Sequence, residues 1–358
     1  MFQYINNWYK RYFTDPQAAL LVILLVPGFI IIYFFGAMLA PLLAAVIVAY
    51  MLEGPVRKLM DRAVPRIVAV SIVFLVFLLF TLFIVVGLLP IVFRQASQFF
   101  QELPGMITRG QDLLLRLPEQ YPDIVTVDMV TEIGNALRGG MSEFGQNILS
   151  FSVASIPAII TVLIYLILVP LMIFFFLKDK EQITDWLRRF LATDHALLSH
   201  IWEEMDDQIG NYIRGKVYEI IIVGVAAFIV FQLLGLNYAP LLAIVVGLSV
   251  LIPYVGAATV TLPVALVGYF QWGFDSTFVW LLVSYFVLQF LDGNVLVPVL
   301  FSDVVNLHPA AIIVAILLFG GLWGFWGVFF AIPLATLVKA LINAWPTLED
   351  EQETTTGS

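Results

Sequence analysis

The chain has 358 residues and a formal net charge of −9 at pH 7, with 61% hydrophobic and only 12% charged residues. A soluble domain carries roughly 45–50% apolar and about 25% charged residues, so the composition excludes a water-soluble globular protein. The negative charge argues against a nucleic-acid partner. The absence of cysteine excludes disulfides, thiolate metal sites and cysteine catalysis.

Long uncharged runs instead predict an all-α polytopic integral membrane protein. About 20 apolar residues suffice to cross roughly 30 Å of hydrocarbon, and residues 18–51, 67–93 and 151–177 each form a longer run. Together with the apolar segments of the C-terminal third, these runs predict about eight spans, with broken or re-entrant helices in that last third.

Residues 1–93 are predicted to form a three-span region. Residues 18–35 and 38–52 give the first two spans, with a tight reversal at Gly36, and residues 67–93 give the third. The loop after the second span is basic, which places it in the cytoplasm by the positive-inside rule and the N terminus with it. Its basic residues are Arg57, Lys58, Arg62 and Arg66.

Residues 94–150 form a small insertion between spans, which we predict to be extracytoplasmic because its acids outnumber its bases. It carries four arginines and seven acidic residues. Apolar residues recur at helical spacing on both sides of residues 118–122, which predicts two amphipathic helices. The insertion either caps the helix bundle or presents a surface that collects substrate or forms oligomers.

Residues 151–216 are predicted to hold a fourth span followed by cytoplasmic amphipathic helices. The last of these helices ends at Arg214 and Lys216, and a span that contains Glu219 begins at once. A helix that lies along the inner leaflet and continues into a span can act as a lever. Arg214, Lys216 and Glu219 are therefore candidate gating or coupling residues, with simple packing as the alternative.

Residues 217–343 are predicted to form the transport core, followed by a disordered acidic tail at residues 344–358. Residues 217–338 contain no lysine or arginine and four acids: Glu219, Asp275, Asp292 and Asp303. An ionisable group inside a bilayer is rare and is usually functional. The acids of this segment are therefore the first residues whose role has to be explained.

The core contains two apolar segments that proline interrupts. Residues 239–270 are apolar throughout and would measure about 48 Å as one helix, which is too long for a straight crossing. Pro253 and Gly256 predict a broken helix or a helical hairpin there, and this choice leaves the side of the C terminus open. Residues 292–309, which contain Pro298, predict a second irregular stretch.

These two interruptions supply the candidate binding site. A helix broken inside a bilayer frees backbone carbonyl and amide groups, which transporters use to coordinate ions and substrates. Asp292 carries the charge that could titrate with a proton or hold a monovalent cation. The alternatives are a kinked helix and a carboxylate that caps a helix at the interface. The predicted substrate-binding or ion-binding residues are Asp292, Asn294, Gln289, Pro253, Tyr254, Gly256 and Pro298.

Small residues near the C terminus predict close helix packing, either within one protomer or between protomers, with a sliding surface for a moving element as the alternative. They are Gly320, Gly321, Gly324 and Gly327. The chain has neither a nucleotide-binding loop of the Walker type nor an HExxH motif. We therefore expect no enzymatic activity, no cofactor and no bound metal.

Four segments resemble the autoinducer-2 exporter family, in particular its PerM-type permease branch. They are residues 175–180 (FFLKDK), 212–216 (YIRGK), 236–256 and 291–333. The resemblance implies a multi-pass secondary transporter of the bacterial inner membrane. It also implies a homo-oligomer, with a pentamer as one assembly, surrounded by membrane lipid.

The same resemblance implies ion-coupled export of a small polar molecule such as the quorum-sensing signal autoinducer-2. Sodium/proton antiport, with Asp292 as the shared site, is the alternative within transport. A membrane scaffold whose external helices bind another protein is the alternative from a different functional class.

Overall fold

The computed structural model describes residues 16–114, 131–132, 156–190, 196–253, 255–301 and 307–344. Within these ranges every regular element is a helix, and no strand occurs. Six of the helical segments are long and apolar enough to cross a membrane, and two shorter apolar helices accompany them. The prediction of an all-α polytopic membrane protein is confirmed.

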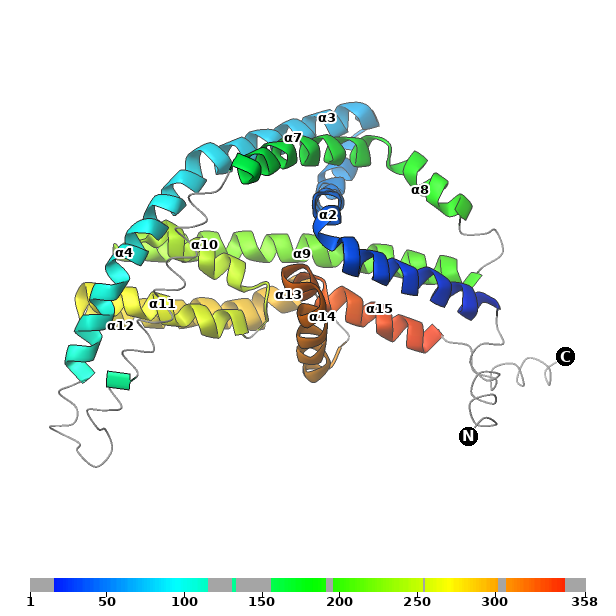
Figure 1. The fold of residues 1–358 in the computed structure, drawn as a ribbon. Helices are drawn as coiled ribbons and strands as arrows, with labels where there is room; N and C mark the ends of the chain where they lie inside the picture. The colour runs from blue at the N-terminus through cyan, green and yellow to red at the C-terminus, as the bar shows by residue number, and fades with distance from the viewer. Residues whose placement is uncertain are drawn as a thin grey trace, which may run out of the picture.

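The first described helix corrects the prediction at Gly36. Helix α2 (Pro16–Met60) runs through this glycine without interruption, so the predicted reversal is wrong. One glycine costs a helix about 1 kcal/mol, whereas backbone groups freed in hydrocarbon cost several kcal/mol each. The chain therefore stays helical, and α2 bends instead. Its first part lies beside α9 and its second part points toward α3 (Figure 1).

A long rod follows α2 and arches over the molecule to its far end (Figure 1). It consists of α3 (Arg66–Phe83), the π-helical turn η1 (Ile84–Leu88) and α4 (Leu89–Leu114). The helix continues across the predicted start of the insertion at residue 94. The second amphipathic helix predicted for the insertion lies outside the described residues.

A buried carboxylate binds the start of α3, the first helix of this rod. Glu53 of α2 is 6% exposed and forms ion pairs with Arg57 at 3.5 Å, Arg66 at 3.8 Å and Lys180 at 3.5 Å. Arg66 also donates a hydrogen bond to the carbonyl of Leu177 at 3.0 Å. These contacts join α2 and α3 to α7 (Ile156–Lys178) and α8 (Lys180–Phe190).

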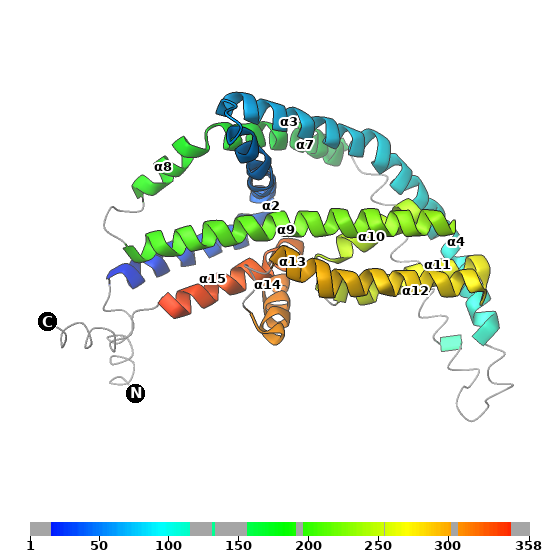
Figure 2. The ribbon, with the colours of Figure 1, turned by 180° about the vertical axis from the view of Figure 1, so that it is seen from behind.

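Helix α9 (Ala196–Leu234) is the longest straight element of the C-terminal part (Figures 1 and 2). The amphipathic helix and the span that the sequence predicts on either side of Lys216 form this one continuous helix. At 39 residues it measures about 58 Å at 1.5 Å per residue. Lys216 therefore lies well inside the helix and far from both of its ends.

The apolar segment after α9 is a helical hairpin, which confirms the predicted broken helix. Helix α10 (Ala239–Ser249) reaches from one end of the molecule to its centre, and α11 (Val255–Trp272) returns to the same end (Figure 1). We call residues 249–253 the hairpin tip. Because both arms are helical, the tip is the place where the backbone hydrogen-bond ladder is interrupted.

The described first part of the second predicted irregular stretch, residues 292–301, is helical, so the expected break at Pro298 is wrong. Helix α12 (Ser276–Leu291) continues through the π-helical turn η2 (Asp292–Leu296) into α13 (Val297–Phe301). Pro298 is the second residue of α13, next to the π-helical turn where the hydrogen-bond register already changes, so its missing N–H interrupts little. Asp303, which the sequence also singles out, lies outside the described residues.

The last reversal lies near the C terminus, inside α14 (Pro309–Phe329), which is kinked at Gly324 and is followed by α15 (Ala331–Ala344). Gly324 has φ +58° and ψ −131°, a conformation that favours glycine. A Cβ on Gly327 would lie 1.8 Å from the carbonyl oxygen of Phe319, and one on Gly320 would lie 2.8 Å from Val328. Gly321 has no such neighbour within 4 Å.

Three hydrophobic clusters hold these helices together. The N-terminal cluster joins α2, α3 and α7, and the C-terminal cluster joins α9, α10, α11 and α12. A third group, the junction cluster, joins α9 to the last three helices and contacts α2. Its buried members are Tyr212, Ile213, Phe301, Ile312 and Ile332.

Candidate functional site

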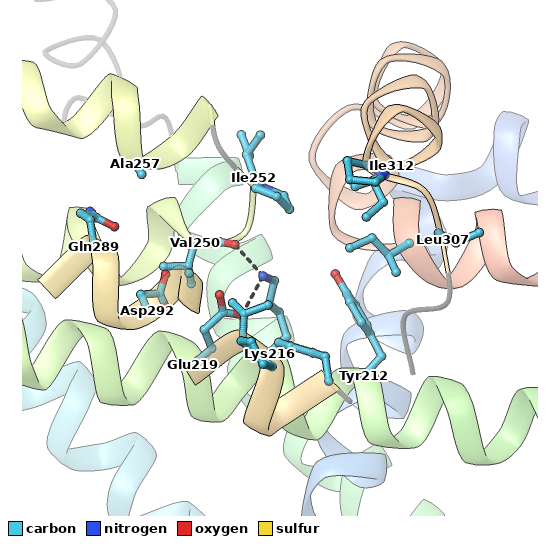
Figure 3. Close-up of a pocket in the computed structure, with 17 residues that line it drawn as sticks. Tyr212, Lys216, Glu219, Val250, Ile252, Ala257, Gln289, Asp292, Leu307 and Ile312 are labelled. Atoms are coloured by element: carbon cyan, nitrogen blue, oxygen red, sulfur yellow. Dashed lines mark hydrogen bonds and ion pairs between the residues drawn. The ribbon is translucent and has the colours of Figure 1, made fainter. Parts of the chain in front are cut away.

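A cavity of about 550 Å³ lies at the centre of the molecule, where α9, the hairpin tip, η2, α13, α14 and α15 meet (Figure 3). Most of its lining is apolar, with proline, valine, isoleucine and phenylalanine side chains. The polar side chains of the lining are few, and they come from α9, α12 and η2. They are Tyr212, Lys216, Glu219, Gln289 and Asp292.

The hairpin tip is shaped by a contact that admits only glycine. A Cβ on Gly256 would lie 1.7 Å from the carbonyl oxygen of Ser249 and 2.6 Å from its carbonyl carbon. The start of α11 therefore packs directly on the end of α10. This contact positions the backbone of Val250 and the side chains of Ile252 and Pro253 at the cavity.

Lys216 is the centre of the polar cluster. It is 3% exposed, and its partner Glu219 is 2% exposed. The ammonium Nζ donates to Glu219 Oε2 at 2.7 Å and to the carbonyl oxygen of Val250 at 2.6 Å, and it lies 5.5 Å from the centroid of the Phe301 ring. One side chain thus joins α9, the hairpin tip and α13 (Figure 3).

Asp292 supplies a second carboxylate, from η2, on the same side of the cavity as Glu219 (Figure 3). The residue is half-buried, and its Oδ1 atom is buried without a hydrogen-bond partner among the described residues. Lys216 attracts this carboxylate electrostatically, while Asp292 and Glu219 repel each other. Figure 3 shows both carboxylates beside Val250. Asp292 therefore keeps hydrogen-bonding capacity for a ligand.

Hydroxyl and amide groups fix the walls on both sides of the charged cluster. Gln289 Nε2 donates to the Tyr285 hydroxyl at 2.8 Å, and this hydroxyl donates to the carbonyl of Ala257 at 3.1 Å. These bonds tie α12 to α11. On the other side the Tyr212 hydroxyl donates to the carbonyl of Phe329 at 3.0 Å, which ties α9 to α14.

The structure brings most of the predicted binding residues together and separates others from them. Asp292, Gln289, Pro253 and Pro298 line the cavity, and Gly256 shapes the tip. Asn294 is exposed and donates to the carbonyl of Phe290 at 2.9 Å, within its own helix. Tyr254 lies outside the described residues.

The predicted gating residues also divide into two groups. Lys216 and Glu219 line the cavity beside the predicted binding residues. Arg214 instead donates to Asn211 at 2.8 Å on its own helix. Sequence reasoning missed the carbonyl of Val250 and the hydroxyl of Tyr212. Tyr212 could have been found from its spacing of four residues from Lys216, which puts both on one helix face, whereas no sequence signal marks a backbone carbonyl.

A second cavity, of about 310 Å³, lies between α4, the turn after α9 and α11. Its charged lining residues, Glu102 and Arg109, are exposed. Burial of Tyr238, together with the nearby carboxylate of Glu102, raises the pKa of the tyrosine hydroxyl to about 12. This cavity lacks the buried charges of the central one, so the central cavity is the stronger candidate.

Comparison with known proteins agrees with this architecture. Residues 21–347 match the model of the AI-2E family transporter. A protein of Escherichia coli (strain K12) named "Putative permease PerM" is 47% identical over 353 residues, which cover 99% of this chain and 100% of the relative. "Putative transport protein YueF" of Bacillus subtilis (strain 168) is 28% identical and covers 86% and 84% of the two chains. The names of both relatives support a transport role, and the match over nearly the whole chain shows that this protein belongs to the AI-2E transporter family.

Proposed function

We propose that the protein is an ion-coupled secondary transporter of the bacterial inner membrane that exports a small polar molecule such as autoinducer-2. The supporting observation is the central cavity. It places a buried ammonium, a buried carboxylate and the free Oδ1 of Asp292 beside an interrupted helical hairpin. Charged groups at membrane depth mark substrate and ion pathways, and broken helices provide their backbone ligands.

The size and chemistry of the cavity fit this substrate class. Sites for small molecules measure roughly 300–1,000 Å³ and are mostly apolar, with a few polar groups that set orientation. Here the volume is about 550 Å³, and the polar groups offer both hydrogen-bond donors and acceptors. A small oxygen-rich molecule would find an ammonium and an amide on the donor side and carboxylates on the acceptor side.

Asp292→Asn is expected to reduce coupled flux at least about tenfold, because it removes the charge while keeping the shape of the side chain. A hydrogen bond to a charged group contributes about 1.5–3 kcal/mol, and 1.4 kcal/mol corresponds to a factor of ten. The measurement is flux of labelled autoinducer-2 in proteoliposomes with an imposed proton gradient. Sodium-driven proton movement is followed in separate vesicles.

Asp275→Asn is the matched control, because Asp275 is an exposed acid in the turn before α12 and lies outside the cavity. It should retain wild-type flux. Signal flux that follows the proton gradient in the control and is lost in Asp292→Asn supports the exporter. Sodium-driven proton movement without flux of autoinducer-2 would show that the substrate is a cation and that the protein is an antiporter. If folded wild-type protein shows neither autoinducer-2 flux nor sodium-driven proton movement, the result contradicts a transport role for this cavity with these substrates.

A further inference from the structure

The charges around the central cavity do not balance. Among the described residues that line it, Lys216 is the basic side chain and Glu219 and Asp292 are the acids. No second base lines the described part of the cavity: residues 217–338 contain neither lysine nor arginine, and Arg214 of α9 donates to Asn211 and is not a lining residue. With all three groups ionised, the site carries one uncompensated negative charge, which is costly away from water.

No other group in the described lining removes this charge. Tyr212 on α9 has its hydroxyl bonded to Phe329, and Gln289 on α12 is neutral. The lining residues of the hairpin, α13, α14 and α15 carry no ionisable side chain. His308 precedes α14, is exposed, and accepts from the amide of Ala310 with its Nδ1.

We propose that the cavity takes up one monovalent cation, a proton or Na⁺, between Glu219 and Asp292, and that this uptake releases Lys216 from the carbonyl of Val250 and frees the hairpin tip. The inference rests on the proposed transport function and adds the number of coupling charges and the element that they move. Among the described residues no group of three or more acids or histidines has the arrangement of a metal site. This favours a singly charged ion, because a divalent cation takes more acidic ligands.

The geometry explains why a cation would act on the hairpin tip. Lys216 stays at Val250 because Glu219, three residues along the same helix, holds the ammonium at 2.7 Å. A proton on Glu219 removes that attraction and leaves Asp292 as the remaining anion, whereas Na⁺ between the two carboxylates repels the ammonium directly. The four-carbon stem of lysine is flexible enough to follow the charge. The Val250 carbonyl, at the end of an interrupted helix, then loses its 2.6 Å partner.

Cysteine labelling measures the state of the tip independently of flux. The natural chain has no cysteine, so Ile252→Cys, at the tip, and Phe274→Cys, in the exposed turn after α11, each introduce a single thiol. The readout is the labelling rate of Ile252→Cys with a soluble maleimide divided by that of Phe274→Cys. This ratio cancels the intrinsic pH dependence of the thiol. It is measured in nanodiscs from pH 5 to pH 9, with and without NaCl.

The ratio is expected to rise at least about fivefold when the cation binds. A rise at low pH without sodium identifies the proton, and a rise with NaCl but not KCl at fixed pH identifies Na⁺. Adding Asp292→Asn should keep the ratio low under all conditions, because Lys216 and Glu219 then balance each other and no excess negative charge remains to attract a cation. A ratio that is flat with pH and with NaCl, or one that responds equally in Asp292→Asn, overturns the proposal.

Flux measured in parallel on the natural chain separates this inference from the proposed function. A flat labelling ratio together with intact coupled flux overturns the Lys216 release alone. A cation-dependent ratio without flux of any tested substrate supports the release and counts against the transport proposal.

Discussion

Lys216→Met is expected to lower the free energy of unfolding by about 3–5 kcal/mol, the usual cost of removing one partner from a buried ion pair. Methionine keeps most of the length of the side chain but leaves Glu219, which is 2% exposed, without a counter-charge. It also leaves the carbonyl of Val250 without its donor and removes the cation from the ring of Phe301. The measurement is unfolding of the purified protein in mixed micelles, followed by circular dichroism.

The double variant Lys216→Met/Glu219→Leu is the control for this result. Replacing both partners of a buried pair by apolar side chains is often neutral or stabilising. The double variant should therefore recover most of the stability lost in Lys216→Met, although the carbonyl of Val250 stays unpaired. If the single variant unfolds at the wild-type denaturant concentration, the pair does not hold the site in the way its distances indicate.

Gly256→Ala is expected to cost about 3 kcal/mol or more and to reduce the yield of monodisperse protein. Overpacking a tight contact commonly costs 1–3 kcal/mol when side chains can yield. Here the added Cβ would lie 1.7 Å from a backbone oxygen, that of Ser249, so the hairpin itself has to open. Size-exclusion chromatography of a fluorescent fusion reports the yield, and denaturant titration reports the stability.

Gly321→Ala provides the matched control, because a Cβ at this glycine in α14 meets nothing within 4 Å. Alanine is also the better helix former by about 1 kcal/mol. The control should be at least as stable as the wild type. Equal unfolding midpoints for Gly256→Ala and Gly321→Ala would show that the tip tolerates a side chain and would contradict the close packing of α10 and α11.

Local physical rules account for the parts of the fold that the sequence predicts. Residues 239–270 are too long for one crossing and contain Pro253, so a broken helix or a hairpin follows from length and backbone chemistry, and only the structure decides for the hairpin. The same reasoning fails at Gly36 and at Pro298. There the cost of freeing backbone groups in hydrocarbon exceeds the local preference, and the chain bends or forms a π-helical turn instead of ending the helix.

The candidate site is predictable in its residue types but not in its connections. Asp292 stands out because acids are rare in the apolar third, and Lys216 and Glu219 because they lie where an amphipathic helix continues into a span. The bond from Lys216 to Val250 is invisible in the sequence, because any residue can supply a backbone carbonyl. Only the folded hairpin decides which carbonyl remains free. Glu53 was missed for a related reason, since two of its three basic partners come from other helices.

The three hydrophobic clusters divide the molecule mechanically. The N-terminal and C-terminal clusters share no residue. The junction cluster is made by α9, α13, α14 and α15 and packs against α2. Four of its five buried members, all except Ile213, also line the central cavity. If the N-terminal helices moved relative to the C-terminal helices by sliding at the junction cluster, the two larger clusters would stay packed. The free-energy cost of the motion would then come from the few side chains of the junction cluster. The same displacement would reshape the cavity, because these four side chains form part of its wall.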